Sequence, residues 1–387
     1  MQVISNRYRS FLLISIILFL FSPLIQSGCL LFKIAPLNGA ISKPEDVPFS
    51  LEKWFTGEYQ TKKETYLNET FGFRELFIRI NNQIAFSLFN KAKANGVIIG
   101  KKNYLYEENY IKAYYGLDYL GYDSIEQKMK KLSFISDTLA KLHKNIIIVF
   151  AAGKGSFYPE YFPDNRKTVK GITNIKTHIE FAKKYGIRYI DFNSYFIANK
   201  YKSKYPLYPQ YGIHWSHYGM CIAADSIIKY IEKTRNIHMP HIYWNKVNID
   251  NPKETDYDIA DGMNLKFKLK SFKMAYPQVQ IESDSGKTKP SVIVISDSFY
   301  WGMFNFGIGN TFKNSHFWYY NKQIYPDSYQ SPLETSQVDL RQQIASNDVI
   351  ILMATEATLP KLGWGFIDKA YQMFRGNVIS PYNTTKQ

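Results

Sequence analysis

A serine stands directly after a strand-like apolar run. Residues 292–295 read Val-Ile-Val-Ile and are followed by Ser296, Asp297 and Ser298. A turn after a buried strand exposes a serine hydroxyl at the sheet edge and leaves nearby backbone N–H groups free to bind a developing oxyanion. Ser298 is therefore a candidate nucleophile, with its own N–H among the oxyanion donors. The same tripeptide is also typical of a helix N-cap, and we expect Asp297 to cap the next helix.

A histidine in a second segment offers the base that such a serine needs. Residues 211–219 read Tyr-Gly-Ile-His-Trp-Ser-His-Tyr-Gly and precede an apolar helical pattern. A serine hydroxyl is a poor nucleophile until a base takes its proton, and the ordinary imidazole pKa suits that task. His214 is the candidate base, and a structural histidine at the start of the helix is the alternative. We expect His217 to be a surface residue.

Chemistry of this kind needs no metal, and the sequence predicts neither a metal site nor a cofactor. The seven histidines include i, i+3 pairs at 214/217 and 238/241, but no HExxH motif or acid-rich companion pattern. Two cysteines, Cys29 and Cys221, make neither a disulfide framework nor a CxxC motif.

Short apolar runs alternate with helical patterns in the larger part of the chain. The runs lie at residues 145–151, 188–192, 291–295 and 348–353, and helical patterns lie at 124–143, 174–185 and 218–233. This alternation predicts an α/β fold with a mostly parallel sheet, whose functional groups gather at the carboxyl ends of the strands.

Three further segments complete the predicted architecture. Residues 54–89 have apolar residues at helical spacing, and residues 97–100 and 104–106 suggest a β-hairpin. Residues 242–289 are polar and irregular, so we interpret them as an insertion or a lid.

The N-terminus predicts export of the domain. Arg7 and Arg9 precede an apolar run from Phe11 to Phe32, about the 20 residues that a membrane helix requires. We expect residues 1–35 to be a cytoplasmic stub and a single-pass anchor, residues 36–50 a linker, and residues 51–380 a domain in the periplasm. A signal cleaved near residues 26–28 and a lipid anchor at Cys29 are the alternatives.

Composition narrows the range of partners. The 387 residues are 45% apolar, which excludes disorder of the whole chain, and 17% are aromatic, which suits surfaces that stack on sugar rings. The formal net charge of +15 is spread without a compact basic block or a nucleic-acid-binding motif. We therefore predict no nucleic-acid partner, and a diffuse positive field that favours anionic polymers or lipid headgroups.

Short segments between Trp54 and Asp368 form an ordered set. They are Phe71-Gly72-Phe73-Arg74-Glu75, Val97-Ile98-Ile99-Gly100 with Tyr104-Leu105-Tyr106, Gly153-Lys154 to Tyr158-Pro159-Glu160, His214-Trp215, Ser296-Asp297-Ser298-Phe299 and Thr355-Glu356-Ala357. No single segment is specific, but their order resembles the SGNH-hydrolase-like family of alginate O-acetyltransferases, the AlgX/AlgJ-like or DHHW-type proteins. The resemblance implies a three-layer α/β/α, flavodoxin-like fold and a serine mechanism without cofactor.

The resemblance also implies roles for individual residues. It makes Ser298 the nucleophile and His214 the base, and it places Lys154, Tyr158 and Trp215 near the oxyanion or the substrate. In the family an aspartate lies two residues before the histidine, where this chain has Gly212.

Three explanations for the missing aspartate remain open. The site is a Ser-His pair, or another acid replaces the aspartate, or the protein binds polysaccharide without catalysis. Glu356 is the first candidate acid and Asp191 the second, with Asp256 and Asp258 behind them.

The function expected from the resemblance is transfer of an acetyl group to an exported or cell-surface polysaccharide. In such systems a multi-pass membrane O-acyltransferase supplies the acetyl group, so the expected location is the bacterial inner membrane, with the catalytic domain in the periplasm. A carbohydrate O-acetylesterase that uses the same residues, or a non-catalytic polysaccharide-binding or assembly factor, is the alternative.

Overall fold

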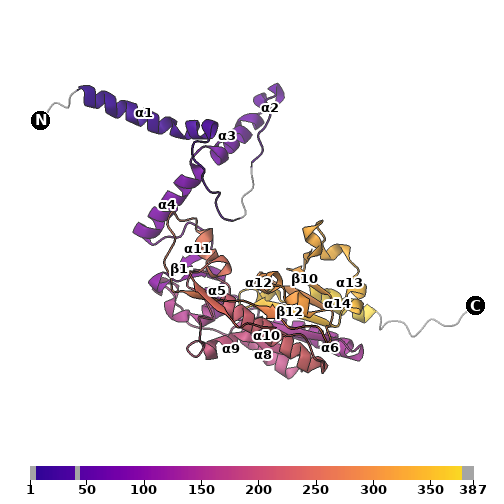
Figure 1. Ribbon diagram of the computed structural model, residues 1–387. Helices are drawn as coiled ribbons and strands as arrows, with labels where there is room; N and C mark the ends of the chain where they lie inside the picture. Colours follow the sequence, from indigo (N-terminus) through magenta and orange to yellow (C-terminus); the bar gives the residue numbers. More distant parts are fainter. Residues whose placement is uncertain (1–5, 40–43, 377–387) are drawn as a thin grey trace, which may run out of the picture. The chain divides into compact units, whose positions relative to one another are not determined.

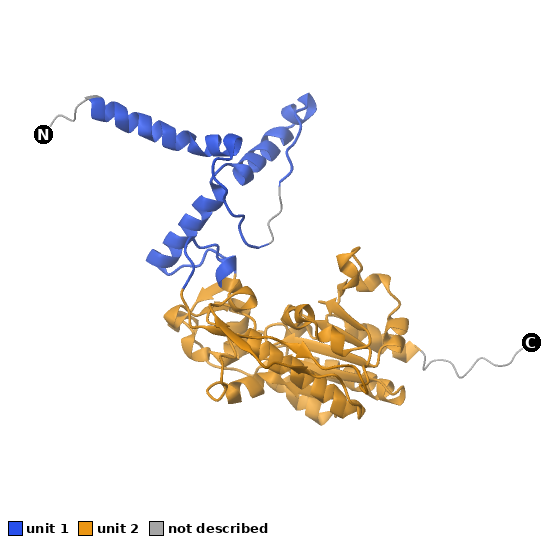
Figure 2. Ribbon diagram, viewed as in Figure 1, with its two compact units in different colours: residues 1–95, 260–269 blue, residues 96–259, 270–387 orange. Residues whose placement is uncertain are grey.

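The computed structural model describes residues 6–39 and 44–376. The chain divides into two compact units, which Figure 2 shows in different colours. Unit 1 comprises residues 1–95 and 260–269, and unit 2 comprises residues 96–259 and 270–387. The segment 51–95, which we expected within the α/β domain, therefore belongs to unit 1, and the α/β unit begins at Gly96.

Unit 2 is built around a six-stranded sheet in the order β11-β10-β9-β12-β3-β4. Figure 1 labels two of these strands, β10 and β12. All neighbours from β10 to β4 are parallel, and β11 is antiparallel at one edge. The strands are β3 (Asn145–Ala151), β4 (Tyr189–Asp191), β9 (Val292–Ser296), β10 (Ser315–Tyr319), β11 (Gln323–Tyr325) and β12 (Val349–Thr355). Strands β3, β4, β9 and β12 confirm the four predicted runs. Strands β10 and β11 were not predicted, because neither has a run of aliphatic residues.

Helices cover both faces of the sheet, which gives the expected three-layer α/β/α fold. On one face, α6 (Tyr122–Lys141), α8 (Asn174–Lys184) and α14 (Phe366–Gly376) share a buried core with strand residues such as Ile148 and Ile350. On the other face, α10 (His217–Arg235) packs against α12 (Phe299–Phe306). The two helices approach so closely that a Cβ at Gly302 would lie 2.4 Å from the sulfur of Met220. A side chain at this position would require the Met220 side chain to move.

Smaller elements surround these layers. The predicted hairpin is present as β1 (Val97–Ile99) and β2 (Leu105–Glu107), paired antiparallel. The remaining α-helices of unit 2 are α5 (Glu108–Tyr115), α7 (Lys154–Phe157), α9 (Phe192–Asn199) and α13 (Leu340–Ser346).

The irregular segment 242–289 contains two small antiparallel sheets, β5–β8 and β6–β7, and the short helix α11. The bounds are β5 (Ile242–Tyr243), β6 (Val247–Asp250), α11 (Asp258–Gly262), β7 (Met274–Pro277) and β8 (Gln280–Ile281). Strand β7 packs against α10, and its four residues are buried. This part of the segment is integrated into unit 2 and brings a carboxylate to the site described below.

Unit 1 contains α1 (Asn6–Cys29), α2 (Leu51–Phe55), α3 (Glu58–Thr70) and α4 (Arg74–Phe89). Within the described part of the chain, α1 is the one helix long and apolar enough to span a membrane. Its C-terminal end is joined to the start of α4, since Ser27 Oγ accepts a hydrogen bond of 2.6 Å from Gly72 N. A Cβ at Gly72 would lie 2.3 Å from the carbonyl oxygen of Pro23, so this approach requires glycine.

Candidate active site

The turn that carries Ser298 is fixed by the carboxylate before it. Asp297 is almost fully buried, and its Oδ1 accepts a hydrogen bond of 3.0 Å from Phe299 N at the start of α12. Its Oδ2 accepts from Thr355 N, at the end of β12, at 3.2 Å and from Thr358 Oγ1, beyond that strand, at 2.5 Å. Ser298, and not Asp297 as expected, holds the N-cap position of α12. The Asp297 carboxylate accepts from the first N–H of the helix and ties the turn after β9 to the neighbouring strand. The Ser298 side chain remains partly accessible.

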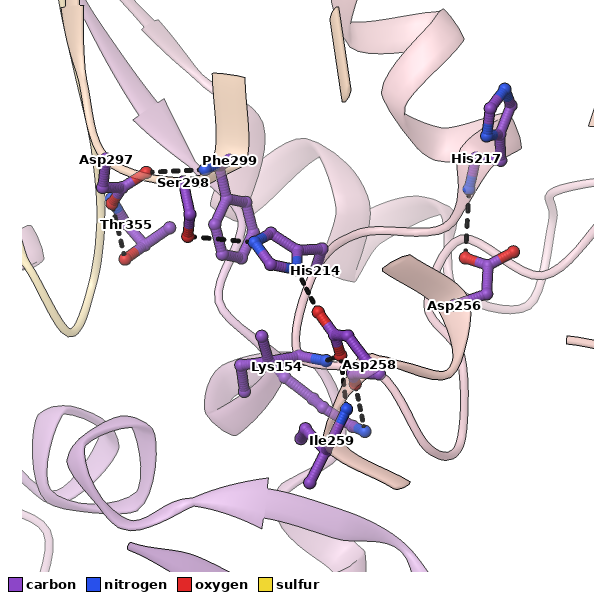
Figure 3. A network of polar contacts seen from close by, with 12 residues as sticks. Lys154, His214, His217, Asp256, Asp258, Ile259, Asp297, Ser298, Phe299 and Thr355 are labelled. Atoms are coloured by element: carbon purple, nitrogen blue, oxygen red, sulfur yellow. Dashed lines mark hydrogen bonds and ion pairs between the residues drawn. The ribbon is translucent and has the colours of Figure 1, made fainter. Parts of the chain in front are cut away.

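His214 and Asp258 complete a continuous hydrogen-bonded chain with Ser298 (Figure 3). His214 Nε2 lies 3.0 Å from Ser298 Oγ, and His214 Nδ1 lies 2.5 Å from Asp258 Oδ2. Asp258 Oδ1 accepts from the backbone N–H groups of Ile213 at 2.9 Å and Ile259 at 2.7 Å. A carboxylate on Nδ1 places the imidazole proton there and leaves Nε2 to accept the serine proton. The arrangement is that of a serine, its base and an orienting acid.

Gly212 explains why the acid comes from elsewhere in the sequence. A Cβ at Gly212 would lie 2.2 Å from the carbonyl oxygen of Thr255 and 2.9 Å from the carbonyl carbon of Asp256. Segment 255–258 thus occupies the space that a side chain at position 212 would need. The same segment delivers the Asp258 carboxylate to His214 across 44 residues of sequence.

The two acids that we preferred from the sequence lie elsewhere in hydrogen-bonded networks, so that prediction is corrected. Glu356 is buried and accepts hydrogen bonds from the backbone N–H and the hydroxyl of Ser156. Asp191 caps α9, accepting from Ser194 N at 2.9 Å and Ser194 Oγ at 2.6 Å. Both carboxylates follow or end strands of the sheet, but the His214 loop approaches from outside the sheet.

Asp256 and His217 form a separate contact beside the site. Asp256 is fully buried, and its Oδ1 accepts from His217 N at 3.2 Å at the start of α10. Burial raises the pKa of Asp256 to about 7. Of the two acids ranked last from the sequence, Asp258 contacts the histidine and Asp256 supports the neighbouring helix start. His217 is half-buried rather than a surface residue, because its ring packs 5.5 Å from that of Tyr276.

Lys154, which we expected near the oxyanion or the substrate, instead contacts the backbone of the loop that carries His214. Its side chain is fully buried, and Nζ donates to the carbonyl oxygens of Gly212 at 2.6 Å and Gln210 at 2.9 Å. Burial lowers the pKa of Lys154 to about 7, while Asp258 and Glu107 oppose that shift. The ammonium group thus fixes the backbone immediately before His214.

Tyr158 and Trp215, which we expected near the substrate, are packing residues. Trp215 is 2% exposed, and its ring contacts that of Phe299 at 5.5 Å. Tyr158 packs edge-on against Tyr104 at 5.0 Å and donates a hydrogen bond of 3.3 Å to the carbonyl oxygen of Tyr208. These contacts position the loops around the site.

Tyr320 is a site residue that the sequence reasoning missed. It follows β10 with a φ of 51°, and its backbone N donates to the carbonyl oxygen of Ser296 at 2.9 Å. Burial raises the pKa of its phenol. Because β10 runs parallel to β9, Tyr320 lies at the same end of the sheet as Ser298. The sequence could have indicated Tyr320 only if residues 315–319 had been predicted as a strand, because Tyr320 directly follows that strand.

The charges around His214 favour its protonated form. Burial by itself would lower the pKa of His214, but Asp258, followed by Asp297 and Glu107, raises the pKa overall. A base whose protonated form is stabilised holds the proton that it takes from the serine. No group of three or more His, Cys, Asp or Glu side chains that would suit a metal ion is present among the residues described.

Comparison with known proteins gives likenesses of fold only. No protein-family model and no curated protein matches the chain. Among solved structures, it is similar to the O-acetyltransferase domain of Pseudomonas putida AlgJ, with 13% identity, a TM-score of 0.49, and coverage of 72% of this chain and 99% of that chain. Pseudomonas aeruginosa AlgX gives 13% identity, a TM-score of 0.45 and coverage of 70% and 67%. Bacillus cereus PatB1 gives 13% identity, a TM-score of 0.43 and coverage of 62% and 91%.

The AlgX/AlgJ-like proteins that the sequence segments resemble are thus among these similar structures. At these identities and TM-scores, the likenesses assign neither an activity nor a catalytic residue to this chain.

Proposed function

We propose that this protein is an O-acyltransferase that transfers an acetyl group to a hydroxyl of an exported or cell-surface polysaccharide through an acyl-enzyme on Ser298. The observation that carries the proposal is the chain of contacts Asp258–His214–Ser298, with 2.5 Å and 3.0 Å between successive polar atoms. A non-catalytic role was considered from the sequence for two reasons: an acid is missing two residues before His214, and aromatic residues are abundant. The contact of Asp258 with His214 supplies an acid and removes the first of these reasons.

In the first half-reaction the serine displaces the leaving group of an acyl donor. His214 Nε2 accepts the hydroxyl proton as Ser298 Oγ bonds to the carbonyl carbon, and Asp258 stabilises the imidazolium that forms. The tetrahedral intermediate collapses, the bond to the leaving group breaks, and His214 returns the proton to that group. We assign the oxyanion to the Ser298 backbone N–H and the Tyr320 phenol, since donors placed where charge develops lower the barrier.

In the second half-reaction an acceptor hydroxyl takes the place of the serine. His214 removes its proton, the acceptor oxygen bonds to the acyl carbon, and the bond to Ser298 Oγ breaks as His214 reprotonates the serine. The product is an ester on the acceptor and the free enzyme. Water in place of the acceptor would make the same site an esterase, so exclusion of water decides between the two outcomes.

The choice of acetyl and carbohydrate rests on the sequence resemblance and on the N-terminal helix. Helix α1 supports a single-pass anchor in the inner membrane, with unit 2 in the periplasm. A periplasmic enzyme cannot draw on cytoplasmic acyl donors directly. We therefore propose that a multi-pass membrane O-acyltransferase supplies the acetyl group.

The decisive experiment uses the full-length protein in lipid nanodiscs with a chromogenic acetyl ester. We expect one acetyl group on Ser298 by intact-protein mass, and transfer that increases when an oligosaccharide is added. Ser298→Ala and His214→Ala should abolish acetyl loading, whereas Ser296→Ala should retain it, because the Ser296 hydroxyl is buried two residues away. Acetate release unaffected by the oligosaccharide would identify an esterase. Absence of both loading and turnover would refute acyl chemistry at this site.

A further inference from the structure

A hollow of about 420 Å³ is lined in part by Tyr320, which follows β10 at the end of the sheet where Ser298 lies. We infer that this hollow binds a pyranose ring of the acceptor polysaccharide. The inference rests on the proposed function, since it places the acceptor next to the proposed acyl-enzyme. Its volume is within the range of about 300 to 1,000 Å³ that is typical of small-molecule sites.

Trp364 gives the hollow an aromatic wall. Its ring lies 5.3 Å from that of Tyr320, at an interplanar angle of 68°. The indole is half-exposed, whereas Trp215 and Trp318 of the same unit are buried. An aromatic face combined with a polar edge suits the alternating C–H and hydroxyl groups of a sugar ring.

The backbone around Trp364 adopts an unusual conformation that keeps the indole there. Gly363, Trp364 and Gly365 have φ values of 77°, 42° and 88°. A left-handed conformation is an outlier for a residue as bulky as tryptophan, and it persists only where the surrounding structure enforces it. Asn321 Nδ2 enforces it by donating to the carbonyl oxygen of Trp364 at 3.0 Å, and Trp364 N donates to that of Lys361 at 2.7 Å.

Asn321 directly follows Tyr320. The two walls of the hollow are therefore connected through the Asn321–Trp364 hydrogen bond as well as through ring contact.

Charged groups at the rim offer both donors and an acceptor to sugar hydroxyls. Lys361 and Asp368 are exposed lining residues, and Asp368 Oδ1 accepts from Lys131 Nζ at 2.6 Å. Lys128 also lines the hollow, and its Nζ donates to the carbonyl oxygen of Pro360 at 2.9 Å. One aromatic wall with a few polar groups is the usual composition of a small-molecule site. The lysine side chains add affinity for acidic sugars.

The location favours the acceptor over the acyl donor. Tyr320 lines the hollow, and its backbone N–H donates to the carbonyl oxygen of Ser296, two residues before the nucleophile. A sugar held against Trp364 therefore lies near the end of β9 that carries Ser298. Holding an acceptor hydroxyl near the acyl-enzyme raises its effective concentration over that of water. The hollow thus provides a physical basis for transfer in preference to hydrolysis.

The test compares Trp364→Ala with Trp244→Ala in the full-length protein. Trp244 is likewise half-exposed in unit 2 but lies in the segment between β5 and β6. With Trp364→Ala we expect the acceptor KM to rise about tenfold, as for an aromatic anchor, while acetyl loading of Ser298 from the chromogenic ester changes less than about twofold. Trp244→Ala should change neither quantity. An unchanged acceptor KM with Trp364→Ala would overturn the inference.

A binding measurement separates this inference from the proposed chemistry. The Ser298→Ala protein should bind the oligosaccharide by calorimetry, and the double variant with Trp364→Ala should bind it about tenfold more weakly. Equal binding by the two proteins would refute the site whether or not the enzyme is active. If Trp364→Ala does not fold, Lys361→Ala and Asp368→Asn probe the exposed rim. Binding unaffected by both rim changes would also count against the hollow.

Discussion

Two carboxylates, Asp258 and Glu356, have the same functional group but different roles, because their surroundings differ. The Asp258 side chain is 28% exposed and bonded to an imidazole and two backbone N–H groups. Glu356 is 3% exposed and bonded to the backbone N–H and hydroxyl of Ser156, and burial raises its pKa to about 7. The two carboxylates differ in their hydrogen-bond partners. A carboxylate beside an imidazole stabilises a transient cation, whereas a buried carboxylate beside a serine joins two loops.

The largest effect should follow replacement of Asp258. Asp258→Asn keeps the shape but offers an amide to His214 Nδ1, so it favours the wrong tautomer, and we expect kcat to fall by about 10³ to 10⁴. The pH dependence supplies a second readout. Because Asp258 raises the pKa of His214, and His214 must be neutral to act, activity of the native protein falls as pH drops through that raised pKa. In the variant, the acid limb of the residual activity should shift to lower pH.

Glu356→Gln is the matched control for that comparison, since it makes the same carboxylate-to-amide change at the other site. A loss of kcat as large as that of Asp258→Asn would mean that Glu356 takes part in catalysis and that the comparison is wrong. Equal activity of Asp258→Asn and the native protein would remove Asp258 from the mechanism.

A smaller loss should follow substitution of Gly212. In Gly212→Ala the new Cβ would meet the Thr255 carbonyl oxygen at 2.2 Å, so segment 255–258 must move and Asp258 with it. A displacement of about 1 Å in a catalytic group can reduce the rate about 10²-fold, and we expect kcat to fall by about that factor while folding is retained. A crystal structure of the variant with Asp258 undisplaced, together with native kcat, would contradict this explanation of the relocated acid.

Lys154 should have a lesser effect again, because it acts through the backbone before His214. Lys154→Met leaves the carbonyl groups of Gln210 and Gly212 without their buried donor. We expect about a tenfold to thirtyfold loss of kcat, and a loss of about 2 kcal/mol in the free energy of unfolding. Acetyl-loading kinetics and thermal unfolding measure the two quantities. A lower stability with unchanged kcat would show that the lysine is structural and does not position His214.

Local patterns in the sequence were enough to predict the parallel sheet, the turn that carries Ser298 and the loop that carries His214. Val292 to Ile295 are continuous aliphatic residues and predict a buried strand, and the end of such a strand is where Ser298 lies. His214 was found from its residue type and its position before a helical pattern. These features depend on short stretches of sequence.

The acid and Tyr320 depend on contacts between distant segments. Asp258 reaches His214 across 44 residues, from a short helix in an irregular region with no periodicity to mark it. Gly212 was read as a missing aspartate, whereas the structure shows that its lack of a side chain admits the segment that supplies one. Tyr320 follows a strand of aromatic and polar residues that has no clear apolar run.

The smallest effect on activity, and a measurable effect on stability, should come from Glu356→Gln. We expect kcat within about twofold of native, since Glu356 bonds Ser156 rather than His214. The folded-state pKa of Glu356 is raised from 4.5 to about 7, so between those values the folded protein holds a proton that the unfolded chain releases, and stability declines as pH rises. Glutamine cannot ionise, so the variant should gain relative to the native protein as pH rises from 4 to 8, by at most about 3 kcal/mol. Denaturant unfolding at both pH values measures this gain. If the native protein and the variant differ in free energy of unfolding by the same amount at pH 4 and at pH 8, ionisation of Glu356 does not destabilise the fold. The contrast between the two carboxylates would then rest on their hydrogen-bond partners alone.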